Sequence, residues 1–428
     1  MKRYPNIDKN LFIKNRAKLI AELKPNSLAV INSNDEMPRN GDQNFSFRQN
    51  SDLFYLSGLE QEKCILCLCP NHPNPALHEV VFILKADETM ETWNGHKYTP
   101  EEVTEISGVK MVKYLDDFDF FFKEMILESN QVYLNQIEYT KYKTEVAYRD
   151  IRFTEKVKAE YPLHKLERLA PLLTKMRLIK EAEELELMRK ACQITKNGFE
   201  RVMRNLKPGM MEYAVEAELT YEFNRQGATH AYAPIVAGGM NALVLHYISN
   251  HQKCEDGDLL LMDFGAEYAN YSADCSRTIP VNGKFTDRQK ECYKAVLHVQ
   301  NEAIKLFVPG NSINIINAAV NKMMEAEMIY LGLFNEDDVK KQKDESPMYF
   351  KYLMHGVNHF IGLDVHDVGA KDTVFEKGMI LTIEPGLYIK EENIGIRIED
   401  NIMVDDIPIN LMQDIPKTVE EIERYMKA

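Results

Sequence analysis

Residues 258–265, Asp-Leu-Leu-Leu-Met-Asp-Phe-Gly, lead a run of apolar side chains up to the carboxylate of Asp263. The run predicts a buried strand, and an ionised carboxylate is rarely buried without a charge partner. Asp274 follows eleven residues later in a second extended segment. The two segments predict a hairpin that turns near residues 269–270 and places the aspartates almost opposite each other, where a divalent cation would offset their repulsion. The alternative, two exposed aspartates beside a turn, is disfavoured by the apolar surroundings of Asp263.

Three histidines, His355, His359 and His366, lie within twelve residues in a chain that contains eleven histidines. Glycines at positions 356, 362 and 369 disfavour a long helix, so residues 355–369 are predicted to form a strand-and-loop segment around a site. Neutral imidazole is a common metal ligand and a proton carrier near pH 7. A single histidine is more often a hydrogen-bonded structural residue, but three together favour a site.

Two further carboxylates lie in strand-like segments, Glu384 in residues 379–388 and Glu399 in residues 394–403. Period-two alternation puts Arg397 and Glu399 on one face of the second segment, so Arg397 is expected beside Glu399. Taken alone, this pair is more simply explained as a solvated salt bridge, but it occurs together with the other candidate ligands. Four carboxylates and one histidine form an oxygen-rich ligand set that suits Mn, Co or Zn, and several carboxylates can bridge two ions. We therefore predict a site for two divalent metal ions, with Mn favoured.

The chain is expected to divide near residue 170, with a linker at residues 161–171. Before it, strand-like runs at 28–32, 64–69, 80–84 and 131–134 alternate with helical patterns such as 118–127, which predicts an α/β domain. Beyond it, one helix is predicted to end before Pro208-Gly209, and a second, opened by a capping box at Thr286, before Pro309-Gly310. The order of helix, Pro-Gly and a further helix thus occurs twice, 101 residues apart. It suggests two related halves that meet at the metal site.

The predicted ligands and their context resemble the pita-bread metallopeptidases, and among them the Xaa-Pro aminopeptidases, or aminopeptidase P. The resemblance rests on residues 355–367 (His-Gly-x-x-His-x-x-Gly-Leu-Asp-Val-His-Asp), residues 382–388 (Thr-Ile-Glu-Pro-Gly-Leu-Tyr), the N-terminal string 47–58 and Arg177-Leu-Ile-Lys180. It covers nearly the whole chain. It implies an α/β (α+β) protein, with a creatinase-like α/β domain at residues 1–170 and a pita-bread catalytic domain of two related halves at residues 171–428.

The resemblance also implies the roles of individual residues. The implied metal ligands are Asp263, Asp274, His359, Glu384 and Glu399, of which Asp263 and Glu399 would bridge the ions. A metal-bridging hydroxide would attack the peptide, Glu384 would carry the proton to the leaving nitrogen, and Arg397 would hold the bridging carboxylate. The remaining implied residues are His246 and His366 at the substrate carbonyl, and His355 and Tyr232 in the substrate site. Trp93 resembles a residue that some relatives offer to a neighbouring subunit, with a structural loop aromatic as the alternative.

The implied activity is hydrolysis of the bond between any N-terminal residue and a penultimate proline. Prolidase, the Xaa-Pro dipeptidase, shares the ligand chemistry and is the main alternative. A non-catalytic binding protein on this fold would be expected to lose ligands, and a creatine-type amidinohydrolase works without metals. Methionine aminopeptidases lack a comparable N-terminal domain. Peptides with a penultimate proline are thus the expected partners, and a homodimer or homotetramer is the expected assembly.

Composition agrees with an enzyme of this size. A chain of 428 residues with 45% hydrophobic residues can form two domains with separate cores. Its net charge of −14 argues against nucleic acid and anionic membranes as partners. The N-terminus lacks the apolar core of a signal peptide, and no apolar run has membrane-spanning length. Cys64, Cys67 and Cys69 are expected to be buried reduced thiols, and a cytoplasmic location is predicted.

Overall fold

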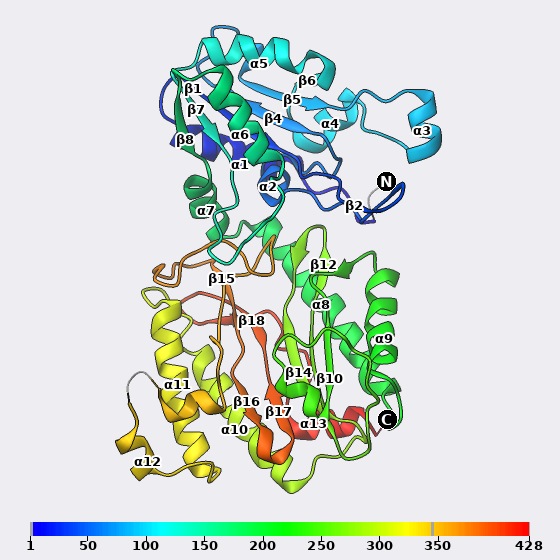
Figure 1. Ribbon diagram of the computed structural model, residues 1–428, viewed down its shortest axis with the longest axis vertical. Coiled ribbons are helices and arrows are strands. Elements are labelled where there is room, and N and C mark those ends of the chain that lie inside the picture. Colours follow the sequence, from blue (N-terminus) through cyan, green and yellow to red (C-terminus); the bar gives the residue numbers. More distant parts are fainter. Residues whose placement is uncertain (1–2, 344–345, 428) are drawn as a thin grey trace. The chain divides into compact units, whose positions relative to one another are not determined.

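The computed structural model describes residues 3–343 and 346–427 and divides into two compact units, Met1–Arg177 and Leu178–Ala428 (Figure 1). The prediction of a linker at residues 161–171 was wrong, because most of these residues form regular structure. Strand β8 (Lys165–Arg168) pairs in parallel with β7 (Gln131–Leu134), and helix α7 (Ala170–Leu178) begins two residues after it. The sequence Lys-Leu-Glu-Arg has no apolar alternation because an edge strand can form its backbone ladder without burying its side chains.

The first unit is built on a six-stranded mixed sheet with the strand order β6-β5-β4-β1-β7-β8. Its remaining strands are β1 (Ser27–Asn32), β4 (Ile65–Leu68), β5 (Glu79–Ile83) and β6 (Met111–Tyr114). The pairs β1–β4 and β4–β5 are antiparallel, whereas β1–β7 and β5–β6 are parallel. All four strand-like runs identified in the sequence are therefore confirmed. A short ribbon of β2 (Pro38–Asn40) and β3 (Gln43–Asn44) lies outside this sheet.

Helices complete the α/β arrangement of this unit. They are α1 (Lys9–Glu22), α2 (Ser51–Ser57), α3 (Glu88–Asn94), α4 (Pro100–Ser107), α5 (Phe118–Leu127) and α6 (Arg149–Glu160). The predicted helix 118–127 is confirmed as α5, whose Phe118 stacks on Phe122 and meets Phe82 of β5 edge-on at 5.1 Å between ring centroids. Cys64, Cys67 and Cys69 are buried and unpaired, as predicted.

One buried acid of the first unit should make its stability depend on pH. Asp150 of α6 accepts a hydrogen bond from Asn32 Nδ2 at 2.8 Å, and burial raises the pKa of its carboxyl to about 7. The Oδ1 atom of Asn32 is buried without a hydrogen-bond partner among the described residues, so a protonated or amide group at position 150 would supply a donor nearby.

We expect Asp150→Asn to stabilise the protein at high pH. Because the pKa of Asp150 is higher in the folded than in the unfolded chain, the wild type loses stability as pH rises from about 4 to about 7, and the variant is spared this loss. Its gain should reach the order of a few kcal/mol above pH 7 and shrink towards pH 4. Calorimetry at several pH values, with the exposed Asp116→Asn as control, measures it. A gain that does not change with pH would contradict the assignment.

The second unit consists of two halves, each of which begins with a pair of helices and continues with strands. The first half contains α8 (Ala182–Asn205), α9 (Glu212–Arg225), β9 (Thr229–His230), β10 (Ile235–Gly238), β11 (Leu259–Phe264), β12 (Ala266–Tyr268), β13 (Tyr271–Ser272) and β14 (Cys275–Pro280). The second contains α10 (Asp287–Ile304), α11 (Ile313–Tyr330), α12 (Glu336–Lys341), β15 (Ile380–Ile383), β16 (Gly386–Ile389), β17 (Ile394–Arg397), β18 (Asp400–Met403), β19 (Ile409–Asn410) and α13 (Val419–Tyr425).

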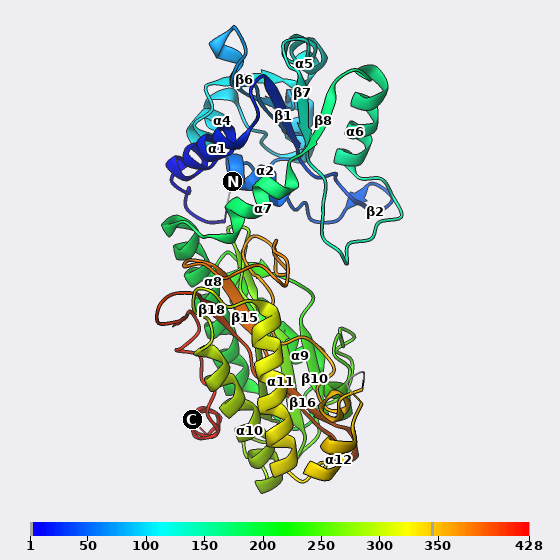
Figure 2. The same ribbon diagram turned by 90° about the vertical axis from the view of Figure 1, so that its left-hand side faces the viewer.

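Both predicted helix pairs are present. Helix α8 ends before Pro208, and the capping box of Thr286 opens α10, which ends before Pro309. Helices α10 and α11 lie side by side, and the strands of both halves run between α9 and α11 (Figures 1 and 2). Within the described ranges, no helix is long and apolar enough to cross a membrane.

The hairpin that carries Asp263 and Asp274 has the predicted turn but a different register. Residues Ala269 and Asn270 turn the chain with φ of 51° and 66°. Strand β11 pairs with β14 so that Ser276, not Asp274, lies opposite Asp263. The chain folds back closely at Gly265, where a Cβ atom would lie 1.8 Å from the carbonyl oxygen of Ala273. Any larger residue would separate the segments that carry the two aspartates.

The predicted single strand at residues 394–403 is broken into two. Strand β17 pairs with β16, whereas β18 pairs with β15 and β19, so the chain changes sheets at Ile398 and Glu399. At this break the backbone N–H of Glu399 donates to the carbonyl of Ser276 at 3.0 Å. The break places Glu399 between two sheets and beside the β14 segment of the other half.

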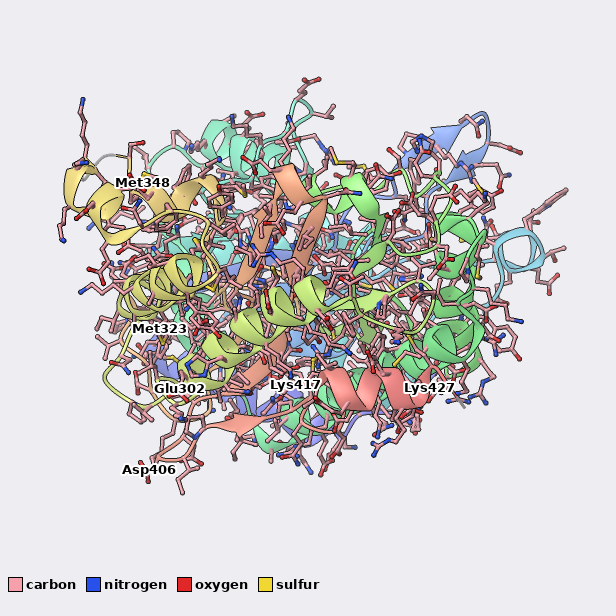
Figure 3. The ribbon with its side chains drawn as sticks, turned by 90° about the horizontal axis from the view of Figure 1, so that it is seen from below. Glu302, Met323, Met348, Asp406, Lys417 and Lys427 are labelled. Carbon is pink, nitrogen blue, oxygen red and sulfur yellow. The ribbon has the colours of Figure 1, made fainter. Side chains whose placement is uncertain are left out.

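A buried ionic cluster joins the two halves behind Glu399. Arg277 of β14 donates to Asp400 Oδ1 and to the carbonyl of Glu399, each at 2.6 Å, and both charged side chains are fully buried. Lys417, labelled in Figure 3 just before α13, donates to Asp400 Oδ2 at 2.8 Å. Although burial acts to raise the pKa of Asp400, the two cations lower it, so this acid stays ionised. The cluster fixes the backbone from which Glu399 projects.

Candidate metal centre

All five predicted ligands lie at strand ends or in the loops between strands. They are Asp263 near the end of β11, Asp274 just before β14, His359 in the loop at 355–369, Glu384 between β15 and β16, and Glu399 between β17 and β18. Strand ends can bring side chains from distant parts of the sequence to one place while the sheets hold each backbone rigidly.

The structure brings these five side chains together. Ligand atoms of Asp274, His359 and Glu399 all lie within 4.8 Å of one another. His359 Nε2 is 3.3 Å from Asp274 Oδ2 and 3.8 Å from Glu384 Oε1, which adds the fourth residue. The fifth, Asp263, is joined through the hydroxyl of Tyr232, which lies 2.6 Å from Asp263 Oδ1 and 2.5 Å from Asp274 Oδ1.

Three acids of this cluster, Asp274, Glu384 and Glu399, are held in conditions that disfavour their charge. Burial raises the pKa of Glu384 to about 7, and burial with neighbouring carboxylates raises the pKa of Asp274 and of Glu399. Burial acts to lower the pKa of His359, but its hydrogen bond with Asp274 and the two nearby acids raise it to about 9. A divalent cation is the partner that would relieve this concentration of negative charge. The donor set therefore fits a metal centre.

The tautomer of His359 also fits a metal ligand. Its Nδ1 lies 3.0 Å from the carbonyl oxygen of Phe360, which only accepts hydrogen bonds, so Nδ1 carries the proton. In the neutral ring the lone pair is then on Nε2, the atom that faces Asp274 and Glu384. A backbone carbonyl that fixes the ring in this way is the usual support of a metal-binding histidine.

Arg397 supports the cluster differently from the sequence prediction. The direct partner expected for it was Glu399, but its Nη2 donates to Asp263 Oδ2 at 2.8 Å. Its Nε donates to Ser276 Oγ, which in turn donates to Glu399 Oε2, both at 2.8 Å. Arg397 therefore reaches Glu399 only through Ser276, because the change of sheets after β17 turns the glutamate away from its own strand.

Arg397 also begins a hydrogen-bonded chain to His355. Its Nη1 donates to the hydroxyl of Tyr388 at 2.9 Å, and that hydroxyl lies 2.9 Å from His355 Nε2. Because His355 Nδ1 is 2.8 Å from the carbonyl of Gly356 and must donate there, Nε2 accepts from Tyr388. Burial and the charge of Arg397 lower the pKa of His355 to about 4, so the ring is neutral at physiological pH.

The other two predicted histidines lie at the exposed side of the cluster. The His366 ring meets the His359 ring edge-on, with 4.5 Å between centroids. His246 lies in an exposed turn and interacts electrostatically with His355. Tyr232, expected on the substrate side, directs its hydroxyl to Asp263 and Asp274, two of the predicted ligands, instead. Its contact with substrate stays a prediction.

Sequence reasoning missed Ser276 and Tyr388. Both carried a signal, since Ser276 follows Asp274 by two residues and Tyr388 follows Glu384 by four, and alternate residues of an extended chain share a face. Neither residue type points to a metal by itself.

Comparisons with known proteins agree with this geometry. The pattern of metallopeptidase family M24 matches residues 186–406, and that of the aminopeptidase P N-terminal domain matches residues 12–133. The Xaa-Pro aminopeptidase of Haemophilus influenzae is 35% identical over 98% of both chains. Escherichia coli aminopeptidase P with the inhibitor Pro-Leu superposes with a TM-score of 0.88 at 34% identity, covering 99% of both chains. The zinc-substituted E. coli enzyme in complex with product superposes with a TM-score of 0.88 at 33% identity, again covering 99% of both chains.

The chain belongs to the Xaa-Pro aminopeptidases of metallopeptidase family M24. The resemblance identified in the sequence is confirmed, as is the fold: a pita-bread catalytic region preceded by the α/β domain of aminopeptidase P. The full-length similarity to Xaa-Pro aminopeptidases also argues against the metal-free amidinohydrolase alternative.

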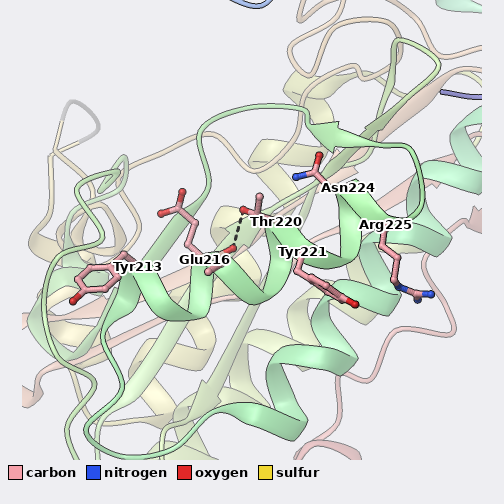
Figure 4. A pocket seen from close by; sticks show the side chains of 7 residues that line it. Tyr213, Glu216, Thr220, Tyr221, Asn224 and Arg225 are labelled. Carbon is pink, nitrogen blue, oxygen red and sulfur yellow. Dashed lines mark hydrogen bonds between the residues drawn. The ribbon is translucent and has the colours of Figure 1, made fainter. Parts of the chain in front are cut away.

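One surface hollow lies apart from the candidate metal centre of this M24 enzyme. It has a volume of about 760 Å³ and is lined by one helix, α9, through Tyr213, Glu216, Ala217, Thr220, Tyr221, Asn224 and Arg225 (Figure 4). None of the five clustered ligands contributes to it.

Proposed function

We propose that this M24 metallopeptidase removes one residue from the N-terminus of peptides whose second residue is proline. The observation that carries the proposal is the complete cluster of four carboxylates and a histidine, with His359 held in the tautomer that leaves Nε2 for a metal. A catalytically silent relative would have no need to keep all five side chains. Release of a single residue from Xaa-Pro-Xaa peptides, identified by mass spectrometry of the products, tests it.

We further propose that Asp263, Asp274, His359, Glu384 and Glu399 hold two divalent ions, with manganese favoured and cobalt or zinc as alternatives. Among these ligands, Asp263 would be held in place by Arg397 directly and Glu399 by Arg397 through Ser276. When bound, such ions supply a Lewis acid for the scissile carbonyl and lower the pKa of water. Carboxylate and imidazole ligands suit Mn²⁺, and zinc is compatible with the related E. coli enzyme.

The protein groups would then handle the proton and the substrate. A penultimate proline makes the scissile bond a tertiary amide, whose nitrogen must receive a proton as it leaves. Glu384 is suited to carry it because a carboxyl group can take a proton from water and pass it on, and its Oε1 lies within the cluster, 3.8 Å from His359 Nε2. His246 and His366, on the exposed side of the cluster, would hold the substrate carbonyl. Neutral His355, fixed by Tyr388, would line the proline pocket.

Prolidase activity is less well supported. A dipeptidase has to bind the free carboxylate of its substrate, and arginine is the natural residue for that task. Arg397 is the arginine of the cluster, but each of its three nitrogens already donates, to Asp263, Ser276 and Tyr388, and its side chain is buried. A longer peptide would place no such demand on the site.

We also propose that the enzyme assembles as a homodimer or homotetramer. Trp93 lies on α3, a helix without buried residues, and is 83% exposed, so it is not the structural loop aromatic considered from the sequence. An exposed tryptophan is more typical of an interface than of a free surface. Sedimentation should give a mass above that of one chain, and Trp93→Ala should shift it towards the monomer. A monomeric wild type would contradict the proposal.

A further inference from the structure

Residues 238–252 carry His246 and contain little regular structure. They leave β10 at Gly238, form the short 3₁₀ helix η3 (Gly239–Leu243), and reach β11 only at Leu259. An irregular segment of this kind has no ladder of its own to fix it, so its conformation depends on side-chain partners. His246, which the proposed function places at the substrate carbonyl, lies in its exposed middle.

One buried carboxylate holds this segment at four points. Glu212, the first residue of α9, is 0% exposed. Its Oε1 accepts from the N–H of Gly238 at 2.8 Å and from Asn241 Nδ2 at 2.9 Å. Its Oε2 accepts from the Tyr247 hydroxyl at 2.7 Å and from the N–H of Gln252 at 2.9 Å. The four donors come from the start, the middle and the end of the segment.

The next turn of α9 makes a second attachment. Glu216 Oε2 accepts from Asn250 Nδ2 at 2.9 Å, and Asn250 also donates to the carbonyl of Pro234 and accepts from the N–H of Val236. Figure 4 shows Glu216 projecting from α9, on the same helix as Thr220. Asn250 has a φ of 43°, a left-handed conformation that these three hydrogen bonds stabilise.

We propose that Glu212 is a positioning residue that fixes His246 for substrate binding. Tyr247, directly after His246, ends in a hydroxyl bonded to Glu212, so the backbone beside the histidine is tied to α9. A carboxylate offers about four acceptor positions, and here each is used on residues 238–252. The inference rests on the proposed function, in which His246 contacts the substrate. Glu212 itself is not placed among the metal ligands.

Glu212→Gln is the informative change because it keeps the shape of the side chain. An amide nitrogen cannot accept, so two of the four donors lose their partner whichever way the amide is oriented. Displacement of a substrate-binding group by about 1 Å can reduce activity by about 100-fold. We therefore expect Glu212→Gln to lower kcat/KM for Xaa-Pro-Xaa peptides by about tenfold or more while the bound metal is retained.

A double-mutant cycle with His246→Ala separates positioning from general damage. If Glu212 acts through His246, Glu212→Gln should cost less than about twofold once His246 is already alanine. Glu218→Gln is the matched control, since Glu218 lies on the same helix but pairs with Arg201 and Asn205 instead of residues 238–252. Metal content and melting temperature are measured for every variant.

Each outcome decides the matter. Wild-type activity in Glu212→Gln, or the same loss in both backgrounds, would overturn the inference. Should Glu212→Gln not fold, Tyr247→Phe replaces it in the cycle, because it removes one donor and leaves the carboxylate three; the same two outcomes then apply. The wild-type enzyme is assayed first, and its failure to cleave Xaa-Pro-Xaa peptides would count against the proposed function. Unchanged activity of His246→Ala refutes its role and the inference together.

Discussion

Complete removal of divalent metal should abolish peptide hydrolysis, and Mn²⁺ should restore it. The clustered acids have no cation other than Arg397 and His359 in contact with them, and Arg397 is occupied by Asp263, Ser276 and Tyr388 within the described residues. No other side chain of the described cluster is a Lewis acid, and the hydroxyl of Ser276 donates to Glu399. Metal ions contribute several kcal/mol of transition-state stabilisation, so the loss should be roughly 10³-fold or larger.

The experiment needs a protein shown to be free of metal. Chelator-treated enzyme is checked by elemental analysis and by circular dichroism, then assayed alone and with added Mn²⁺, Co²⁺, Zn²⁺ or Mg²⁺. Recovery is expected to be greatest with Mn²⁺ and to require two equivalents. Full turnover by the verified metal-free protein would refute a metal-dependent mechanism, and saturation at one equivalent would refute the two-ion site.

Glu384→Gln should reduce kcat by about 10²- to 10⁴-fold, the usual contribution of a positioned proton carrier. The change preserves the shape of the side chain but removes the carboxyl group that would carry the proton. The fold should be retained, since the backbone N–H of Glu384 donates to Val357 independently of the side chain.

Two measurements make this variant interpretable. Metal content must match the wild type, because Glu384 is also a proposed ligand, and Glu376→Gln, an exposed glutamate eight positions earlier, serves as the control. A decrease of less than about tenfold with metal fully bound would show that another group moves the proton.

The sequence was most informative where apolar patterns surround a charged residue. The apolar run before Asp263 and the turn at residues 269–270 predicted the hairpin, and three clustered histidines predicted a site without a helix. What it could not provide is the pairing of strands. The register opposite Asp263 depends on the tight crossing at Gly265, and the break at Glu399 depends on pairing with two different sheets.

Contacts between distant segments were equally out of reach. Tyr232 joins two aspartates 31 and 42 residues away, and Ser276 joins Arg397 to Glu399 from 121 and 123 residues away. A hydroxyl carries no charge or periodicity that marks such a role. The edge strand β8 was missed for a related reason. Its charged side chains give no apolar alternation, and the strand is held by backbone pairing with β7.

Substrate length and proline dependence test the central claim most directly. We predict that kcat/KM is highest for Xaa-Pro-Xaa peptides, lower for the bare Xaa-Pro dipeptide and near background for Xaa-Ala-Xaa. The dipeptide should be the poorer substrate because the described cluster has no free arginine for a substrate carboxylate. The alanine peptide should be poor because the site is proposed to act on a tertiary amide, which only proline provides. A preference for the dipeptide would make the enzyme a prolidase, and equal cleavage of the alanine peptide would contradict proline specificity.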